Sequence, residues 1–407
     1  MLQIVGHVLQ GCHSPAAPPP APPWRRGRRG AARDGGANAA PQVARVGVPR
    51  LEAPALAGGV RRARGLAFER ALGARVGLAA RGVVELGRRW AGRMSTVSQY
   101  YSLKQSKNNN KEIYERSISN VQGFWSDVSK DIFWYKKPSK ILNSDSPPFY
   151  KWFQDGVTNT CYNAVDLHVE NGNGKKLAII YDSPITNSKK KITYAELKNQ
   201  VSIFAGALVN QGIKKGDRVI IYMPMIPEAV IGMLACGRIG AVHSVVFGGF
   251  APNELASRID DSKAKIILSA SCGYEPGRTI EYKPLLKKAI ELAKHKPEKC
   301  IIYQRKDFKV DLEKNEIDWN DAVKEAKPVE CVEMNANDYA YILYTSGTTG
   351  VPKGIVRDIG GHIVALKWTM KNIYNIDPDD VWWSASDIGW IVGHSYIVYA
   401  PLFHGCT

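Results

Sequence analysis

Between residues 174 and 346 the chain alternates short apolar runs with longer amphipathic stretches. Each apolar run is six to nine residues long and rich in β-branched or aromatic side chains, which is typical of a buried strand. The runs lie at 176–184, 218–224, 241–247, 264–271, 299–304 and 338–344. Stretches with helical spacing lie between them at 193–211, 227–240, 253–262 and 283–295. This alternation predicts an α/β fold with a mainly parallel sheet covered by helices on both faces.

The helix expected from residue 194 has signals at both ends. Thr193 and Glu196 have the spacing of a capping box, and Gly212 is placed to end the helix. Four apolar residues fall on one helical face: Val201, Phe204, Ala205 and Leu208. We therefore expect an amphipathic helix that buries this face.

The first 95 residues have a different composition. Residues 1–94 hold sixteen Arg, no Lys and four acidic residues, so they supply +12 of the formal net charge of +17. Pro, Ala, Gly and Arg dominate, and large apolar residues are too few for a core, which predicts a disordered leader over 1–95. Such a leader suits a mitochondrial transit segment, with an RNA-binding arm as the alternative. Because aromatic residues are not interleaved with the arginines, we expect no nucleic-acid partner.

Residues 96–170 are expected to form an N-terminal region that precedes the alternating pattern. Near Thr96 the composition changes to Lys, Asn, Ile and aromatic residues. Residues 121–140 look like an aromatic-rich helical segment, and residues 145–156 are expected to be largely extended at their proline pair. Residues 171–407 form the third predicted part.

Cysteine and histidine spacing gives no sign of a metal site. The seven cysteines are far apart and form no CxxC pair, so reduced and buried thiols are expected. Four histidines without a common spacing are interpreted as structural: His168, His243, His362 and His404. No run approaches the ~20 apolar residues of a membrane-spanning helix.

A glycine-rich loop, TSGTTGVPKG, occupies residues 345–354 directly after an apolar run. Its glycines let the backbone curl around a ligand, its hydroxyls and amides donate hydrogen bonds, and Lys353 adds a mobile positive charge. In parallel sheets, ligands bind beyond the carboxyl ends of strands, where this loop is expected. The spacing is not that of a Walker A loop, and an ordinary polar turn is the alternative to a polyphosphate site.

The string YTSGTTGVPKG resembles the signature of the adenylate-forming, AMP-binding superfamily of acyl-CoA synthetases, luciferases and peptide-synthetase adenylation domains. Further segments resemble short-chain acyl-CoA synthetases: TCYNAVDLH, VIIYMPMIPEAVIGMLACGRIGAVHSVVFGGF, EPGR and WWSASDIGWIVGHSYIVYAPLFHG. EPGR and DIGWIVGHSY are most similar to the mitochondrial propionyl-CoA synthetase branch. The leader has no such resemblance.

The resemblance implies an adenylate-forming large N-terminal domain and a ligase reaction in two steps. A carboxylate attacks the α-phosphate of Mg²⁺-ATP to give an acyl-adenylate and pyrophosphate, and the thiol of coenzyme A (CoA) then displaces AMP. ATP with Mg²⁺, CoA and a short-chain carboxylate are the implied ligands. By similarity, seven residues grip the ATP phosphates: Thr345, Ser346, Gly347, Thr348, Thr349, Gly350 and Lys353.

The segment SDIGWIVGHSY resembles the part of the family that lines the acyl pocket and the pantetheine tunnel. Its candidate pocket residues are Trp390, Ile391, Val392 and Gly393, with His394 near the tunnel. Acetyl-specific members generally have threonine at the position of Val392. A more apolar wall favours a slightly longer carboxylate, so propionate is the expected substrate and acetate the alternative.

By the same resemblance, six residues would lie on the CoA path: Gly248, Gly249, Glu275, Pro276, Gly277 and Arg278. Acetyl-CoA synthetases carry two arginines on the CoA nucleotide, whereas this chain has Glu275 and Arg278 at those positions. This difference weakens a two-arginine phosphate clamp. Tight packing of the glycine pair and a surface turn at EPGR are the structural alternatives.

The printed chain ends at Thr407, inside the region of resemblance. The family's adenine and ribose motifs, Mg²⁺-binding acid, hinge and C-terminal lysine are not found before this point, so the domain is expected to be incomplete and no catalytic residue is assigned. We expect ATP-dependent short-chain acyl-CoA ligase activity as the family function, with little activity of this 407-residue chain by itself. A non-catalytic fragment or regulatory isoform is the alternative from another class. The leader favours the mitochondrial matrix over the cytosol, and the oligomeric state is left open.

Overall fold

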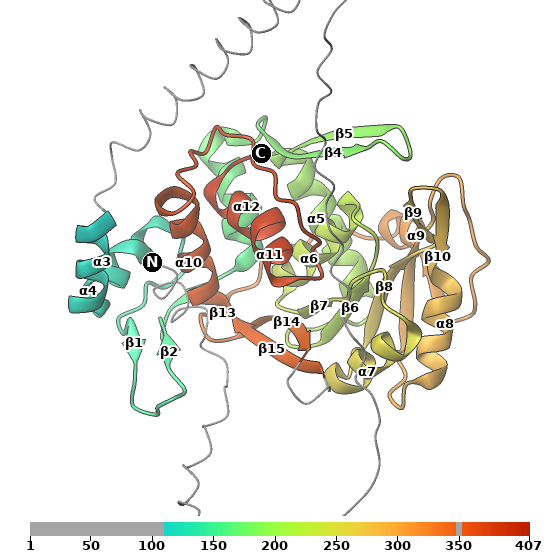
Figure 1. Cartoon of the computed structure of the whole chain (residues 1–407), viewed down its shortest axis with the longest axis horizontal. Coiled ribbons are helices and arrows are strands. Elements are labelled where there is room, and N and C mark those ends of the chain that lie inside the picture. The colour runs from blue at the N-terminus through green and yellow to red at the C-terminus, as the bar shows by residue number, and fades with distance from the viewer. Residues whose placement is uncertain (1–109, 347–351) are drawn as a thin grey trace, which may run out of the picture. The chain divides into compact units, whose positions relative to one another are not determined.

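The computed structural model describes residues 110–346 and 352–407 (Figure 1). The predicted leader lies outside the described residues, as do four of the predicted ATP-binding residues: Gly347, Thr348, Thr349 and Gly350. Among the helices described, none is both long enough and apolar enough to cross a membrane.

A seven-stranded sheet forms the centre of the described part. Its strands are β6 (Arg218–Tyr222), β7 (Val242–Val245), β8 (Ile266–Ala270), β11 (Lys299–Tyr303), β12 (Glu316–Asp318), β14 (Tyr339–Ser346) and β15 (Pro352–Asp358). Their order across the sheet is β12-β11-β8-β6-β7-β14-β15. Neighbouring strands pair in parallel except β14 and β15, which form an antiparallel hairpin. The prediction of a mainly parallel α/β sheet is therefore confirmed.

Helices cover this sheet on both faces. They are α5 (Tyr194–Asn210), α6 (Pro227–Ile239), α7 (Pro252–Ser262), α8 (Tyr282–Leu292), α9 (Trp319–Lys324), α10 (Ile359–Asn372), α11 (Ile391–Gly393) and α12 (Ala400–His404). The crossover connection from β6 through α6 to β7 runs toward the β15 edge of the sheet. The connections from β7 through α7 to β8, and from β8 through α8 to β11, run toward the β12 edge. Because such crossovers are right-handed, α6 lies on one face and α7 and α8 on the opposite face. Helix α5 packs against both α6 and α9.

The capping box and the glycine stop that were predicted for the helix from residue 194 are both present in α5. The Thr193 hydroxyl accepts a hydrogen bond from the Glu196 amide (3.2 Å), and a Glu196 carboxylate oxygen accepts one from the Thr193 amide (2.8 Å). Gly212 has a φ of 84°, a conformation that glycine adopts without strain. All four residues of the predicted apolar face are fully buried.

Two predictions for the N-terminal region were wrong in part. Helices α3 (Asn110–Ser119) and α4 (Val121–Val128) are followed by a 3₁₀ turn at Ser129–Asp131, so the helical segment covers only the first half of 121–140. Beyond it, tertiary contacts replace the helix: the Trp134 indole donates to the Ser129 carbonyl (2.8 Å), and the Phe133 amide donates to the Asn163 side chain (2.8 Å).

The proline pair at 147–148 is not extended. These residues form a turn that begins at Ser146, where the Phe149 amide donates to the Ser146 carbonyl (2.8 Å). The turn reverses the chain, so that β1 (Leu142–Asn143) pairs with β2 (Lys151–Trp152) in antiparallel fashion. The preference of proline for extended neighbours is thus overridden by hairpin pairing.

Smaller elements surround the sheet. Strand β3 (Val157–Thr158) pairs with β13 (Met334–Asn335), β4 (Leu177–Ser183) with β5 (Ser188–Thr193), and β9 (Cys272–Glu275) with β10 (Arg278–Glu281). The chain adopts π-helical turns at Tyr162–Asp166, Val169–Asn173 and His394–Tyr399.

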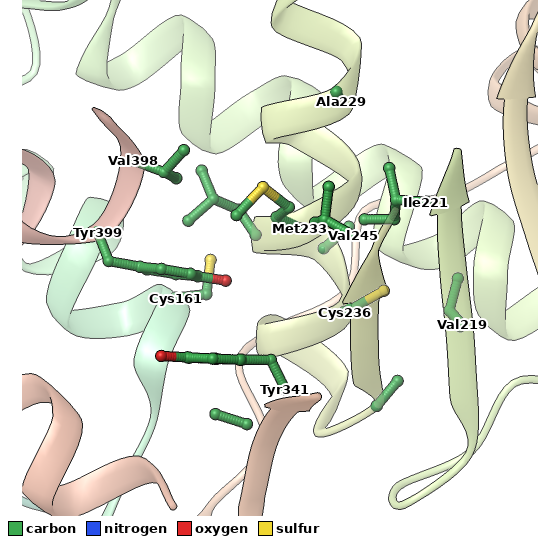
Figure 2. Packing of buried hydrophobic residues seen from close by; sticks show 14 of the residues in the cluster. Cys161, Val219, Ile221, Ala229, Met233, Cys236, Val245, Tyr341, Val398 and Tyr399 are labelled. Atoms are coloured by element: carbon green, nitrogen blue, oxygen red, sulfur yellow. The ribbon is translucent and has the colours of Figure 1, made fainter. Parts of the chain in front are cut away.

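The core is continuous between the sheet and its helices. Residues of α6 pack beside strand residues, and the rings of Tyr341 and Tyr399 lie nearly parallel, with centroids 6.5 Å apart (Figure 2). Tyr341 belongs to β14, and its only paired position on β7 is His243. Side-chain packing therefore contributes much of what holds β14 against the parallel strands.

Candidate functional site

The described residues of the predicted ATP and CoA sites lie at or after the carboxyl ends of strands of the central sheet, or on the strand that follows the glycine-rich loop, whereas the predicted acyl-pocket residues at 390–394 follow helix α10. Residues 246–251 follow β7, the β9–β10 hairpin follows β8, and the glycine-rich loop follows β14. Because these strands are parallel, their carboxyl ends lie along the same edge of the sheet. Figure 1 shows the β14–β15 hairpin at this edge, near α7.

The glycine-rich loop connects two antiparallel strands. Strand β14 continues to Ser346, two residues beyond the predicted run, and pairs with β15 so that Thr345 lies opposite Lys353. Both residues are exposed. The hairpin therefore presents a hydroxyl and an ammonium group from adjacent strands at the base of the loop.

Helix α7 supports this hairpin through polar and aromatic contacts. The Tyr344 hydroxyl donates a hydrogen bond to an Asp261 carboxylate oxygen (2.7 Å), and burial, together with this carboxylate, raises the pKa of Tyr344. The Arg258 guanidinium carbon lies 5.3 Å from the centre of the Tyr344 ring and 4.7 Å from that of Phe250. Arg258 thus connects the β14–β15 hairpin to the loop after β7. These contacts join residues far apart in sequence, and no local pattern could have indicated them.

The candidate acyl-pocket residue Trp390 packs on that same loop. Its ring centroid lies 5.8 Å from those of both Phe247 and Phe250. Trp390, Ile391 and Val392 remain 45%, 44% and 53% exposed, so their side chains are accessible beside the loop. The structure therefore brings the predicted acyl-pocket segment next to the predicted CoA segment.

The next two predicted residues are buried. A Cβ atom added to Gly393 would lie 2.0 Å from the Asp387 carbonyl oxygen, so only glycine fits there. His394 is fully buried, and its Nε2 atom lies 3.1 Å from His243 Nε2, which is also 3.2 Å from the Tyr399 hydroxyl. Burial lowers the pKa of His394 well below its usual value. His394 therefore belongs, with His243 and Tyr399, to a cluster of neutral, buried side chains, whereas the preceding pocket residues are exposed.

The predicted glycine pair packs against aromatic rings. A Cβ atom on Gly248 would lie 2.1 Å from the Tyr282 hydroxyl oxygen, and one on Gly249 would lie 2.5 Å from the Phe247 ring. Gly273, at the start of the β9–β10 hairpin, also lies close to the Tyr282 hydroxyl. Tyr282, which sequence analysis did not single out, is therefore the residue where the two predicted CoA segments meet.

The EPGR segment forms the tip of the β9–β10 hairpin. Glu275 pairs with Arg278 across the strands, and Pro276 and Gly277 form the turn, with a φ of 77° at Gly277. Arg278 donates two hydrogen bonds to one Glu275 carboxylate oxygen, at 2.8 Å from Nε and 2.6 Å from Nη2. The candidate CoA-binding cation is thus already paired within its own hairpin.

An apolar groove of about 550 Å³ lies between β4 and residues 381–402. Its lining includes Met225, Trp382, Trp383 and Leu402, together with Ser386 and Ile388 of the segment SDIGWIVGHSY. The candidate acyl-pocket residues at 390–394 do not line it, so the groove borders the predicted acyl-pocket segment without including its candidate residues.

Comparisons with known proteins identify the family. The family model described as AMP-binding enzyme matches residues 167–407, and the one described as acetyl-coenzyme A synthetase N-terminus matches residues 110–164. The chain is 52% identical over 296 residues to "Acyl-CoA synthetase short-chain family member 3, mitochondrial" of Rattus norvegicus and of Homo sapiens, covering 72% of this chain and 43% of each relative. It is 43% identical to the acetyl-coenzyme A synthetase of Streptomyces coelicolor, over 73% of this chain and 46% of that protein.

A solved structure shows the same fold. The acetoacetyl-CoA synthetase from Streptomyces lividans superposes with a TM-score of 0.67 at 21% identity, over 74% of this chain and 46% of that one. The chain spans less than half the length of these relatives. From the match over 167–407 and the sheet that carries the glycine-rich hairpin, we conclude that the chain belongs to the AMP-binding enzyme family.

Proposed function

We propose that the protein is an ATP-dependent short-chain acyl-CoA ligase that converts propionate, ATP and CoA to propionyl-CoA, AMP and pyrophosphate. The observation that carries the proposal is the β14–β15 hairpin, which places Thr345 opposite Lys353 at the carboxyl edge of a parallel sheet. The similarity to the short-chain family member 3 proteins supports the substrate class.

In this proposal the hairpin binds the phosphates of Mg²⁺-ATP. Its hydroxyls, amides and Lys353 donate hydrogen bonds to the β- and γ-phosphates, where negative charge accumulates as pyrophosphate leaves. Strand pairing holds the backbone of Thr345 and Lys353, so these two donors start close to each other, and donors that need little reorganisation stabilise a transition state best. Trp390, Ile391 and Val392 would then contact the acyl chain of the carboxylate beside the loop after β7.

The test is carboxylate-dependent exchange of pyrophosphate with ATP, followed by kcat/KM for acetate, propionate and butyrate. We expect propionate to be preferred in a form of the chain extended to the length of its relatives. The change Val392→Thr should shift preference toward acetate by about tenfold, because one methylene group is worth about 1–3 kcal/mol in an apolar pocket. Equal kcat/KM for acetate and propionate would favour the alternative, an acetate–CoA ligase.

We further propose that the 407-residue chain alone gives little exchange. Trp390, Ile391 and Val392 are about half exposed, whereas adenylate formation requires a carboxylate shielded from water. Robust exchange by the purified 407-residue chain would contradict this proposal. A non-catalytic role of this chain is the alternative that absence of exchange supports.

Replacing Lys353 with alanine is expected to lower the rate of exchange by about 100-fold, since loss of one preorganised donor costs about 3 kcal/mol of transition-state stabilisation. The measurement is exchange by the extended form at saturating propionate. Lys137, an exposed lysine in the N-terminal region, provides the matched control, and Lys137→Ala should leave the rate unchanged. A normal rate in the Lys353→Ala variant would remove the basis for placing the phosphates at this hairpin.

Replacing Glu275 with glutamine is expected to tighten CoA binding by about three- to tenfold at low ionic strength. The change frees Arg278, which now donates both hydrogen bonds to Glu275, to contact a phosphate of CoA. Isothermal titration with CoA measures the effect, and the gain should disappear in Glu275→Gln/Arg278→Gln. If the double variant binds CoA as tightly as Glu275→Gln, the hairpin does not contact the nucleotide.

We propose a location in the mitochondrial matrix, with the cytosol as the alternative. The Arg-rich segment 1–94 and the mitochondrial relatives support this location. Fluorescence of the chain fused at its C-terminus, compared with a chain that lacks residues 1–94, tests it.

A further inference from the structure

Two cysteines that are 170 positions apart in the sequence meet beside a buried carboxylate. One carboxylate oxygen of Asp166 lies 3.9 Å from Cys161 Sγ and 3.7 Å from Cys331 Sγ, and these groups lie within 4.8 Å of one another. A hydrogen bond with Cys161, and then burial, raise the pKa of Cys331. Cys161 is fully buried, whereas Cys331 is the one partly exposed thiol among the six cysteines described.

This cluster is poorly suited to a metal cation. Arg238 donates to both Asp166 oxygens, at 2.7 and 3.0 Å, and Lys198 lies 3.1 Å from one of them. The guanidinium also donates to Cys161 Sγ at 3.6 Å. A divalent ion bound by the two sulfurs would therefore lie next to two positive charges, with a carboxylate whose oxygens are already used.

A disulfide is neutral and needs no carboxylate ligand, so neither the two nearby positive charges nor the occupied oxygens of Asp166 oppose its formation. Its formation removes two weak S–H donors from Asp166, while Arg238 and Lys198 continue to satisfy the carboxylate. The sulfurs must approach from within 4.8 Å to the ~2 Å of a disulfide bond, which side-chain rotation and small shifts can supply.

The backbone around both cysteines is already fixed in place. Arg238 Nε donates to the Val329 carbonyl (2.6 Å), and the Val332 amide donates to the Arg238 carbonyl (2.9 Å). From the other segment, the Asn159 amide group donates to the Val332 carbonyl (2.8 Å). Folding thus holds the two thiols next to each other in a way that the unfolded chain does not.

We propose that Cys161 and Cys331 form a reversible disulfide when the folded chain meets a low-molecular-weight disulfide. Cys331 loses its proton to the buffer and attacks one sulfur of the reagent, which forms a mixed disulfide and releases one reagent thiolate; this step is slow because the raised pKa of Cys331 keeps its thiolate fraction small. Cys161 then attacks Cys331 Sγ and passes its proton to the departing reagent sulfur, so that the second half of the reagent leaves as a thiol. The protein loses two electrons and two protons, and the reagent disulfide is reduced to two thiols.

This site does not depend on the proposed ligase activity. The disulfide would join the π-helical turn at Tyr162–Asp166 to the segment that leads into β13 and β14. It would close a loop of about 170 residues and so restrict the unfolded chain strongly, which stabilises the folded state.

The test is equilibration of the 407-residue chain in buffers of reduced and oxidised glutathione, followed by acid quenching, alkylation, digestion without reduction and mass spectrometry. We expect a linked peptide pair that contains Cys161 and Cys331, reversed by dithiothreitol. The oxidised protein should unfold at a midpoint about 5 °C higher than the reduced protein.

The variant Cys331→Ser should remove both the linked pair and the shift in midpoint, because a partly exposed thiol can be changed with little effect on folding. Cys12→Ser, outside the described residues, is the matched control and should leave both unchanged. In urea, which unfolds the chain, the Cys161–Cys331 peptide pair should no longer form in preference to other cysteine pairs. A folded chain that keeps glutathione on Cys331 while Cys161 remains a thiol would overturn the proposal. Tight binding of Zn²⁺ that is lost in Cys331→Ser would overturn it in favour of a metal site.

Discussion

Replacing Arg238 with methionine is expected to lower the free energy of unfolding by about 3–5 kcal/mol, because removal of one partner leaves a buried carboxylate without its main neutralising group. Arg238 is fully buried, and its partner Asp166 is 1% exposed. Two charge-assisted hydrogen bonds join their side chains, and a third contact of Arg238, to the Val329 carbonyl, is lost as well. Urea unfolding of the 407-residue chain, followed by tryptophan fluorescence, measures the change.

The matched control is Arg278→Met, which also removes two arginine–carboxylate hydrogen bonds but from an ion pair whose side chains are 69% and 44% exposed. Exposed pairs contribute little, so this variant should lose less than about 1 kcal/mol. The double variant Arg238→Met/Asp166→Leu should be more stable than Arg238→Met alone, since no buried charge then lacks a partner. Equal losses for Arg238→Met and Arg278→Met would contradict the interpretation that burial makes the first pair critical.

Lowering the pH from 6.5 to 5 is expected to remove much of the stability of the folded chain. Burial lowers the pKa of His243 and His362 to about 3 and that of His168 to about 4, and it lowers the pKa of His394 well below its usual value. Below pH 6.5 these histidines bind protons in the unfolded state but remain neutral in the folded state. Their contribution is complete above pH 6.5 and falls as the pH approaches 3–4, by about 2 kcal/mol for each histidine at pH 5.

Two carboxyl groups work in the opposite direction. Burial raises the pKa of Asp358 to about 6 and also raises that of Asp387. These carboxyls bind protons at a higher pH in the folded state than in the unfolded state, so they offset part of the lost stability. Unfolding free energies measured between pH 5 and 8 give the net proton uptake. His362→Phe should lower this uptake by about one proton. Neither ring nitrogen of His362 has a hydrogen-bond partner among the described residues, and the ring packs against Tyr341, Tyr399 and Phe403. An unchanged pH dependence in this variant would show that His362 is not buried in its neutral form.

Local signals predicted the regular parts of the fold well. The capping box at Thr193 and the glycine at 212 act within a few residues of the helix that they delimit, and they are present in the structure. Five of the six apolar runs became strands of the parallel sheet, where most of their side chains are buried on both faces. The run at 176–184 instead forms β4, which pairs only with β5 in an antiparallel hairpin and alternates between buried and exposed residues. In contrast, the turn at Pro147 and Pro148 depends on β1 pairing with β2, which no pattern within the segment could specify.

The candidate site was predictable only where a short motif carries its chemistry. The string at 345–354 and the segment at 386–396 could be identified in the sequence, and the structure brings the latter next to the loop after β7. The contacts of Arg258 with Phe250 and Tyr344, and the position of Tyr282 beside Gly248, arise from tertiary packing. A surface turn at EPGR is one of the alternatives that the sequence indicates, but the pairing of Glu275 with Arg278 follows from the strand pairing of β9 with β10, which the quartet alone does not specify.

The single paired position between β14 and β7 has a mechanical consequence. A strand bound along its whole length to its neighbour can move only with the sheet, but β14 is fastened at Tyr341 and leans on side chains beyond that point. Among the described residues, the support of β14 therefore changes along its length, from a backbone pair at Tyr341 to the hydroxyl and ring of Tyr344, so that the position of its carboxyl end depends on helix α7 as well as on the sheet.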